Sequence, residues 1–189
     1  MEKFKIIIER HISGKKVLGL FILTNVVYAI MLSVTIPKIM GFSKGMKLLD
    51  MMPIGYDFNY VNQLFRTLGE NGRKTYLTSQ IPADMVYPLL FGISYCLLIA
   101  YFLKKLNKIN TSYIYLCFLP VIAGIADYLE NIGIIIMLKS FPEITETTVN
   151  VTSLFSVIKS ISTSIFFMIL LVILIFLGVK LIKKKGFTN

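Results

Sequence analysis

Four stretches of apolar residues dominate the pattern of hydrophobic and polar positions along the chain. They run over about residues 17–36, 84–104, 113–138 and 155–179. Each is long enough to supply the about 20 residues with which an α-helix crosses the hydrocarbon core of a bilayer. The pattern therefore predicts an all-α protein, an integral membrane bundle of four transmembrane helices.

The connection between the first two predicted spans, residues 37–83, contains a helical pattern of its own. Asp57 is a candidate N-cap and Gly69 a stop signal, and the apolar positions between them have helical spacing. These positions are Phe58, Val61, Leu64, Phe65 and Leu68. We expect an amphipathic helix in this first external loop, lying on the outer membrane surface with its apolar face toward the lipid.

The composition agrees with a membrane protein and excludes other classes. The 189 residues are 56% hydrophobic, with a mean hydropathy of +0.74, which is more apolar side chain than a soluble domain of this length can bury. We expect a single membrane domain over residues 1–189. The chain has 20 Lys and Arg against 10 Asp and Glu. This excess fits a cytoplasmic membrane face, where anionic headgroups attract basic side chains, so membrane lipids and no nucleic acid are the expected partners.

Cysteine and histidine are too few for the usual metal and redox sites. Cys96 and Cys117 both fall inside predicted spans without CxxC spacing, and His11 is the single histidine. We therefore interpret the cysteines as packing residues, expect no cofactor and assign no metal site.

The distribution of Lys and Arg predicts the orientation of the spans. The side that holds both termini and the loop 105–112 has eleven Lys or Arg in 34 residues, against seven in 61 residues on the other side. Lys and Arg accumulate in the short loops on the cytoplasmic side of a membrane. Both termini are therefore expected to be cytoplasmic, in a multi-pass protein of the cell membrane. The basic residues before 17–36 also fit a signal peptide, but the apolar length and the poor cleavage site favour a retained span.

The chemically informative stretch lies inside the third predicted span. Asp127, Glu130 and Asn131 are spaced i, i+3 and i+4, so a helix projects both carboxyls and the amide from one face. Each acid costs about 2.5 to 3.5 kcal/mol at the centre of a span, so this face needs partners, protonation or both. If antiparallel spans fold at the middle of their turns, Asp84 and Lys159 come to the depth of Glu130 and Asn131.

Other polar residues predict a pocket that opens toward the external face. Arg73 and Tyr76 precede Asp84 by two to three helical turns and are placed to cap the cluster from outside, if this segment is helical. The candidate residues for a ligand or proton site are Asp84, Asp127, Glu130, Asn131, Lys159, Arg73 and Tyr76. The alternative is a buried salt-bridge network that only fixes the register of the helices. The excess of carboxyls over cations favours binding of a cation or of protons.

Three short motifs lie within residues 57–138. They are Gly72-Arg73-x-x-Tyr76, Asp84-x-x-x-Pro88 and Asp127-Tyr128-x-Glu130-Asn131. In this order they resemble the pattern of small, uncharacterised four-span membrane proteins of bacteria. The resemblance implies no activity.

Three functions fit these features. The first is an outward-facing acidic pocket that binds or moves a cation, a proton or a small cationic or amphiphilic ligand, and transport by only four helices would favour a homo-oligomer. The second is an intramembrane enzyme acting on a lipid or isoprenoid headgroup, with two carboxyls as acid and base and with Arg73 and Lys159 on a phosphate. The third is an accessory subunit of a larger membrane complex.

Overall fold

The computed structural model of the chain describes residues 6, 8 and 10–186, so Lys3 and Lys5, which contribute to the predicted orientation, lie outside the described residues. All regular structure within these residues is helical. The membrane-length helical segments comprise α2 (Gly14–Ile30) with η1 (Met31–Thr35) and α3 (Ile36–Met40), then α5 (Ile81–Lys105), η4 (Ser112–Cys117) with α6 (Phe118–Ser140), and α7 (Glu146–Gly186). The first connection contains η2 (Leu49–Met51), α4 (Phe58–Thr75) and η3 (Tyr76–Gln80).

Four of the described helical segments are long and apolar enough to cross a membrane, which confirms the predicted number. They run over Gly14–Met40, Phe58–Lys105, Ser112–Ser140 and Glu146–Lys183. Each is longer than the apolar stretch that predicts it, and the second includes α4 and η3 ahead of α5. At the start of α7, Thr145 Oγ1 accepts a hydrogen bond from the Thr148 N–H at 3.2 Å, as an N-cap side chain does.

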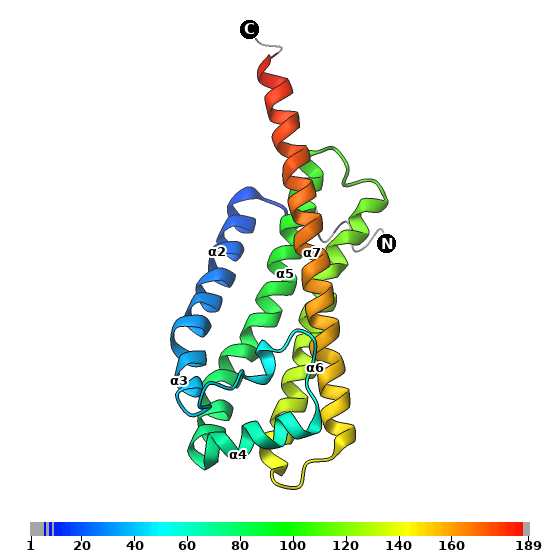
Figure 1. Cartoon of the computed structure of the whole chain (residues 1–189). Coiled ribbons are helices and arrows are strands. Elements are labelled where there is room, and N and C mark those ends of the chain that lie inside the picture. Colours follow the sequence, from blue (N-terminus) through cyan, green and yellow to red (C-terminus); the bar gives the residue numbers. More distant parts are fainter. Residues whose placement is uncertain (1–5, 7, 9, 187–189) are drawn as a thin grey trace.

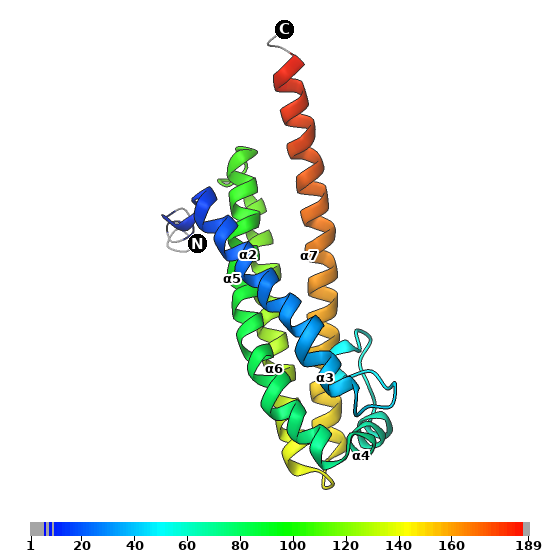
Figure 2. The same cartoon turned by 90° about the vertical axis from the view of Figure 1, so that its left-hand side faces the viewer.

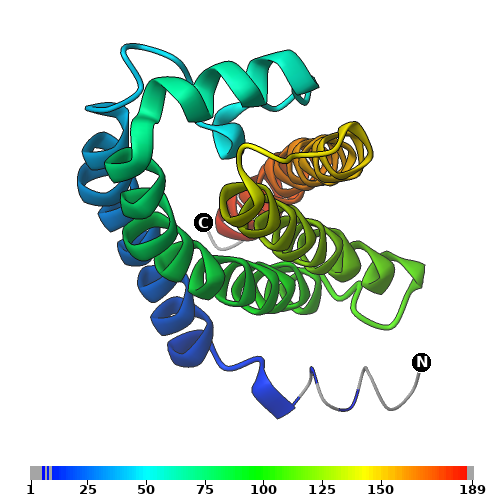
Figure 3. The ribbon, with the colours of Figure 1, turned by 90° about the horizontal axis from the view of Figure 1, so that it is seen from below.

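The long helices form an open arc. Helix α2 packs along α5, α5 along α6, and α6 along α7, and Figure 3 shows this succession from below. The start of α2, the turn between α5 and η4 and the end of α7 lie toward one end of the molecule, whereas α4 and the connection between α6 and α7 lie at the other (Figure 1). The side between α2 and α7 is therefore not closed by direct packing of two neighbouring helices.

Helix α4 begins after Asp57 and continues past Gly69, the expected stop signal, to Thr75. The Asp57 carboxylate accepts a hydrogen bond from the Tyr60 N–H at 2.7 Å, and Gly69 interrupts the helical backbone with φ of 63°, a value that favours glycine. The apolar positions Leu64 and Phe65 are fully buried, in a cluster that includes Ile134 and Met137 of α6. This apolar face is therefore covered by the protein itself, and not by lipid as expected from the sequence.

Two apolar cores occupy opposite ends of the molecule. One surrounds Ile99 and Phe166 in the half near the α5–η4 turn, and the other surrounds Leu64 and Met137 beneath α4. Charged side chains of α5, α6 and α7 lie between these two cores. The fold thus places its buried charged groups in a layer where three membrane-length helices and the first connection meet.

Candidate functional site

A buried ion-pair cluster joins α6 to α7. The Nζ atom of Lys159 lies 3.3 Å from Oδ1 of Asp127 and makes an ion pair with Oε2 of Glu130. Glu130 is fully buried and Asp127 is 6% exposed. This contact confirms that Lys159 reaches the depth of the acids of α6. One ammonium group here faces two carboxyls, so the cluster has an excess of negative charge when both are ionised.

The α6 and α7 backbones approach closely beside this cluster because of a glycine. A Cβ atom built on Gly133 would lie 2.1 Å from Oγ1 of Thr152, far inside contact distance. Small residues let membrane helices approach in this way. Gly133 therefore brings α7 near enough for Lys159 to reach the acidic face of α6.

Asn131 and Tyr128 bind the backbone of α5 at a proline break. Pro88 has no N–H, so the carbonyl of Asp84, four residues earlier, loses its helical donor. Asn131 Nδ2 donates to that carbonyl at 3.0 Å, and the Tyr128 hydroxyl donates to the neighbouring carbonyl of Met85 at 2.8 Å. The amide of Asn131 thus replaces the missing bond, which is the usual requirement for tolerating proline in a membrane helix. This geometry assigns Asn131 a structural contact and connects two of the three motifs seen in the sequence.

The Asp84 side chain is a buried acid without a direct partner. Asp84 is 4% exposed, and its carboxyl makes no hydrogen bond or ion pair with any other residue that the structure describes. It interacts electrostatically with Asp127, Asp50, Glu130 and Lys159, so three of these four neighbours carry its own sign of charge. A carboxylate in this position is costly unless a cation or a proton neutralises it.

Asp50 adds a fourth carboxyl to the layer, and it comes from the first connection. Oδ1 of Asp50 accepts a hydrogen bond from the buried Tyr76 hydroxyl, and Oδ2 accepts one from Gln80 Nε2 at 3.1 Å. The Gln80 Oε1 atom in turn accepts a hydrogen bond from Thr35 of η1. These bonds attach the loop carboxyl to η3 and η1, two segments whose π-helical turns lie beside proline residues.

Tyr56 brings a phenol to the same layer from the loop before α4. Its hydroxyl is buried without a hydrogen-bond partner among the described residues. Burial raises the pKa of the Tyr56 phenol, and the nearby negative charge of Glu130 adds to this rise. Tyr56 is therefore a neutral donor close to Glu130. Its backbone N–H is fixed to α7 by Ser153 Oγ at 2.8 Å.

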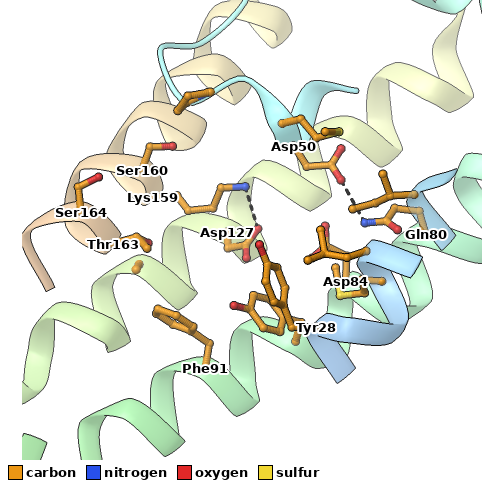
Figure 4. A pocket seen from close by; sticks show the side chains of 17 residues that line it. Tyr28, Asp50, Gln80, Asp84, Phe91, Asp127, Lys159, Ser160, Thr163 and Ser164 are labelled. Atoms are coloured by element: carbon orange, nitrogen blue, oxygen red, sulfur yellow. Dashed lines mark hydrogen bonds and ion pairs between the residues drawn. The ribbon is translucent and has the colours of Figure 1, made fainter. Parts of the chain in front are cut away.

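A cavity of about 470 Å³ lies in front of these groups. In Figure 4, Asp50, Asp84 and Asp127 surround one space, Lys159 extends into it from α7, and Tyr28 and Phe91 lie on another side. Tyr28 stacks on Tyr87, another lining residue, with ring centroids 5.3 Å apart. The cavity therefore combines carboxylates with aromatic faces.

The structure distributes the seven candidate residues over three environments. Asp84, Asp127 and Lys159 line the cavity. Behind its wall lie Glu130, Asn131 and Tyr76, each in contact with a lining residue. Arg73 is elsewhere: its guanidinium donates to the Phe65 carbonyl at 2.8 Å and lies 4.5 Å from the centre of the Phe141 ring. The expected cap of Arg73 over the cluster is therefore not formed.

The side of the cavity that faces away from α4 is closed by aromatic packing. Phe91 packs on Tyr95 with ring centroids 4.7 Å apart and on Phe166 at 5.8 Å. Tyr95 also accepts a hydrogen bond from Asn25 at 3.4 Å, and so Asn25 contacts this aromatic group rather than the cavity. The closure separates the acidic layer from the opposite half of the molecule.

The sequence did not predict three residues of this layer, which are Asp50, Gln80 and Tyr56. Asp50 stands in a connection, but it is flanked by Leu48 and Leu49 on one side and by methionines on the other. An acid between apolar residues outside a predicted span was the available signal. Gln80 and Tyr56 had no comparable signal.

Nothing in the described part of the chain groups three or more His, Cys, Asp or Glu side chains in a metal-binding arrangement. Comparisons of the chain with protein-family models, with curated proteins and with solved structures found no match. Inference about function therefore rests on the chemistry of the cavity.

Proposed function

We propose that the cavity binds a small organic cation with an apolar body, in a multi-pass protein of the cell membrane. Asp84 is the primary counter-ion in this proposal, and Asp127 and Asp50 complete the negative wall. Lys159 neutralises part of the wall by pairing with Asp127 and Glu130. The ligand supplies the positive charge that the protein lacks.

The observation that carries the proposal is the unpartnered carboxyl of Asp84, which lies in a cavity wall. Four acids of this layer, Asp50, Asp84, Asp127 and Glu130, face a single ammonium group among the described residues of the ion-pair cluster. Removing a charge from water without a partner costs several kcal/mol. A bound cation removes this cost at Asp84, and a proton is the competing solution.

The aromatic wall favours an organic cation over a bare ion. The faces of Tyr28, Tyr87 and Phe91 attract positive charge through their quadrupoles and also accept apolar groups. A cavity of about 470 Å³ lies within the range of about 300 to 1,000 Å³ that small-molecule sites occupy. A quaternary or protonated amine with an attached ring fits both properties.

The orientation and the route of entry belong to the same proposal. The start of α2, the end of α5 and the end of α7 lie toward one end of the molecule (Figure 1). These segments carry Lys15 and Lys16, Lys104 and Lys105, and Lys180, and positive residues favour the cytoplasm. We therefore assign that end to the cytoplasm and α4 to the outer membrane surface. The cavity lies between α2 and α7, two helices with many exposed apolar side chains, so an amphiphile enters from the outer leaflet. If the protein moves its ligand across the membrane, four helices per chain favour a homo-oligomer or a larger membrane partner.

Calorimetric titration in a mild detergent tests the proposal, with benzyltrimethylammonium as the probe. Asp84→Asn keeps the shape of the side chain but removes its charge, and we expect it to raise the Kd at least about tenfold. Glu146→Gln is the matched control, because this acid lies at the exposed start of α7. An equal Kd for the wild type and Asp84→Asn contradicts the proposal, as does a wild type that does not bind the probe.

The proton alternative has its own signature. If Asp84 carries a proton instead of a ligand, infrared spectroscopy of the wild type shows a protonated carboxyl band that disappears in Asp84→Asn and persists in Glu146→Gln. The double variant Asp127→Asn, Glu130→Gln gives a further test of the cation proposal, because it removes the partners of Lys159 while leaving Asp84 in the cavity wall. Under the cation proposal, this double variant leaves Lys159 as an unpaired competitor and weakens binding of the probe.

A further inference from the structure

A second cavity lies at the opposite end of the molecule from α4. It has a volume of about 790 Å³ and is formed between α7 and the turn that joins α5 to η4. Figure 2 shows the last part of α7 standing apart from α5 and α6 at this end. The residues that line it are not those of the acidic cavity.

The walls of this groove are apolar and its outer end is basic. Leu103, Leu116, Ile169 and Val172 are among the apolar lining residues. Three lysines, Lys108, Lys180 and Lys183, complete the lining, and no acidic residue is among the described side chains that form it. The Lys180 Nζ atom donates to the carbonyl of Lys105 at 2.7 Å, which places this lysine over the end of α5.

The groove has the length of one leaflet. Along α7, the distance from Ile169 to Lys180 is roughly 17 Å at about 1.5 Å per residue. Half of a hydrocarbon core of about 30 Å has nearly the same thickness. The apolar part of the groove thus matches an acyl chain in one leaflet, and the lysines lie at the level of its headgroup.

We propose that this groove is a binding site for an anionic phospholipid. An acyl chain lies against Leu116, Ile169 and Val172, and the lipid phosphate contacts Lys108, Lys180 and Lys183. Charge complementarity selects an anionic headgroup, because basic side chains near the membrane surface attract anionic lipids. The site is independent of the acidic cavity and of any ligand bound there.

A second copy of the chain is a poorer occupant. In a parallel pair related by a twofold axis, this end of one chain meets the same end of the other. Lysines would then face lysines, with no acidic side chain among the described lining residues to neutralise them. The lipid explains both the apolar groove and its basic end.

Native mass spectrometry of the full chain tests this site. The protein is released from a mild detergent in the presence of dioleoyl phosphatidylglycerol or dioleoyl phosphatidylcholine. The test variant carries Lys108→Gln, Lys180→Gln and Lys183→Gln. The control carries Lys15→Gln, Lys16→Gln and Lys104→Gln, which removes the same charge from exposed lysines at the same end, outside the groove lining.

We expect retained phosphatidylglycerol on the wild type and the control, and at least a tenfold lower apparent affinity for the test variant. Val172→Phe, which fills the groove, lowers the affinity as well, whereas Leu171→Phe on the exposed face of α7 does not. The proposal is overturned if both triple variants lose lipid equally, because bulk charge then explains the binding. Equal affinity for phosphatidylcholine also overturns it, and so does a dimer that Val172→Phe dissociates without loss of lipid.

Discussion

The contact between Asn131 and the proline break in α5 predicts a measurable coupling. Asn131→Ala removes the N–H donor of the Asp84 carbonyl, and the helix cannot replace it because Pro88 lacks an N–H. Stranding a buried acceptor costs about 1 to 3 kcal/mol. Side-chain hydrogen bonds within membranes are worth about 0.6 kcal/mol on average and about 1.7 kcal/mol at most, which places the expected loss near 1 kcal/mol. In a Pro88→Ala background the new N–H of residue 88 donates to the same carbonyl, so Asn131→Ala is expected to cost much less there.

A double-mutant cycle measures this coupling. The free energy of unfolding is determined by titrating SDS into detergent-solubilised wild type, both single variants and the double variant. We expect an interaction energy of about 1 kcal/mol between residues 88 and 131. Tyr128→Phe serves as a comparison, because its hydroxyl donates to the carbonyl of Met85. Additive effects of Pro88→Ala and Asn131→Ala would refute the reasoning, since Asn131 would then stabilise the protein by some route other than the proline break.

Two further substitutions test the ion pairs and the close helix contact by the same unfolding titration. Lys159→Met leaves Asp127 and Glu130 without their ammonium partner, so we expect a loss of about 3 to 5 kcal/mol. Adding Glu130→Gln should recover part of that loss, and no recovery would contradict the pairing. Gly133→Ala forces a Cβ against α7 and should cost about 1 to 3 kcal/mol, whereas Gly178→Ala, with open space around it, should be neutral or slightly stabilising. Equal effects of the two alanines would contradict the close α6–α7 contact.

The helices and part of the acidic layer follow from local sequence signals. Apolar length alone predicts the four membrane-length segments, and the spacing of Asp127, Glu130 and Asn131 places them on one helix face. The expected depth of Lys159 is correct, because the short connection of residues 141–145 restricts how far α6 and α7 can slide. These features depend on helical periodicity and on turn length, which are properties of neighbouring residues.

The remaining contacts depend on how the first connection folds back over the helices. Asp50 joins the cavity through bonds to Tyr76 and Gln80, residues 26 and 30 positions away. Arg73 contacts Phe141 instead of the acidic layer because α4 kinks at Gly69, four residues before Arg73. Neither helical spacing nor apolar length determines such contacts. Helical spacing and apolar length also do not determine the rotation of each helix about its axis. This rotation decides which candidate side chains face the cavity.

Asp84 connects the structural part of the acidic layer to the proposed binding site. Its carbonyl is held by Asn131 at the proline break, and its carboxyl lies in the cavity wall. A proline break frees a backbone carbonyl that must find another hydrogen-bond donor in lipid, and a side chain of a neighbouring helix is one such donor. Asn131 of α6 satisfies that carbonyl, and the same contact fixes the position of the Asp84 carboxyl in the wall of the proposed site. A register-fixing network and a binding site are therefore compatible here, because opposite ends of one residue serve the two roles.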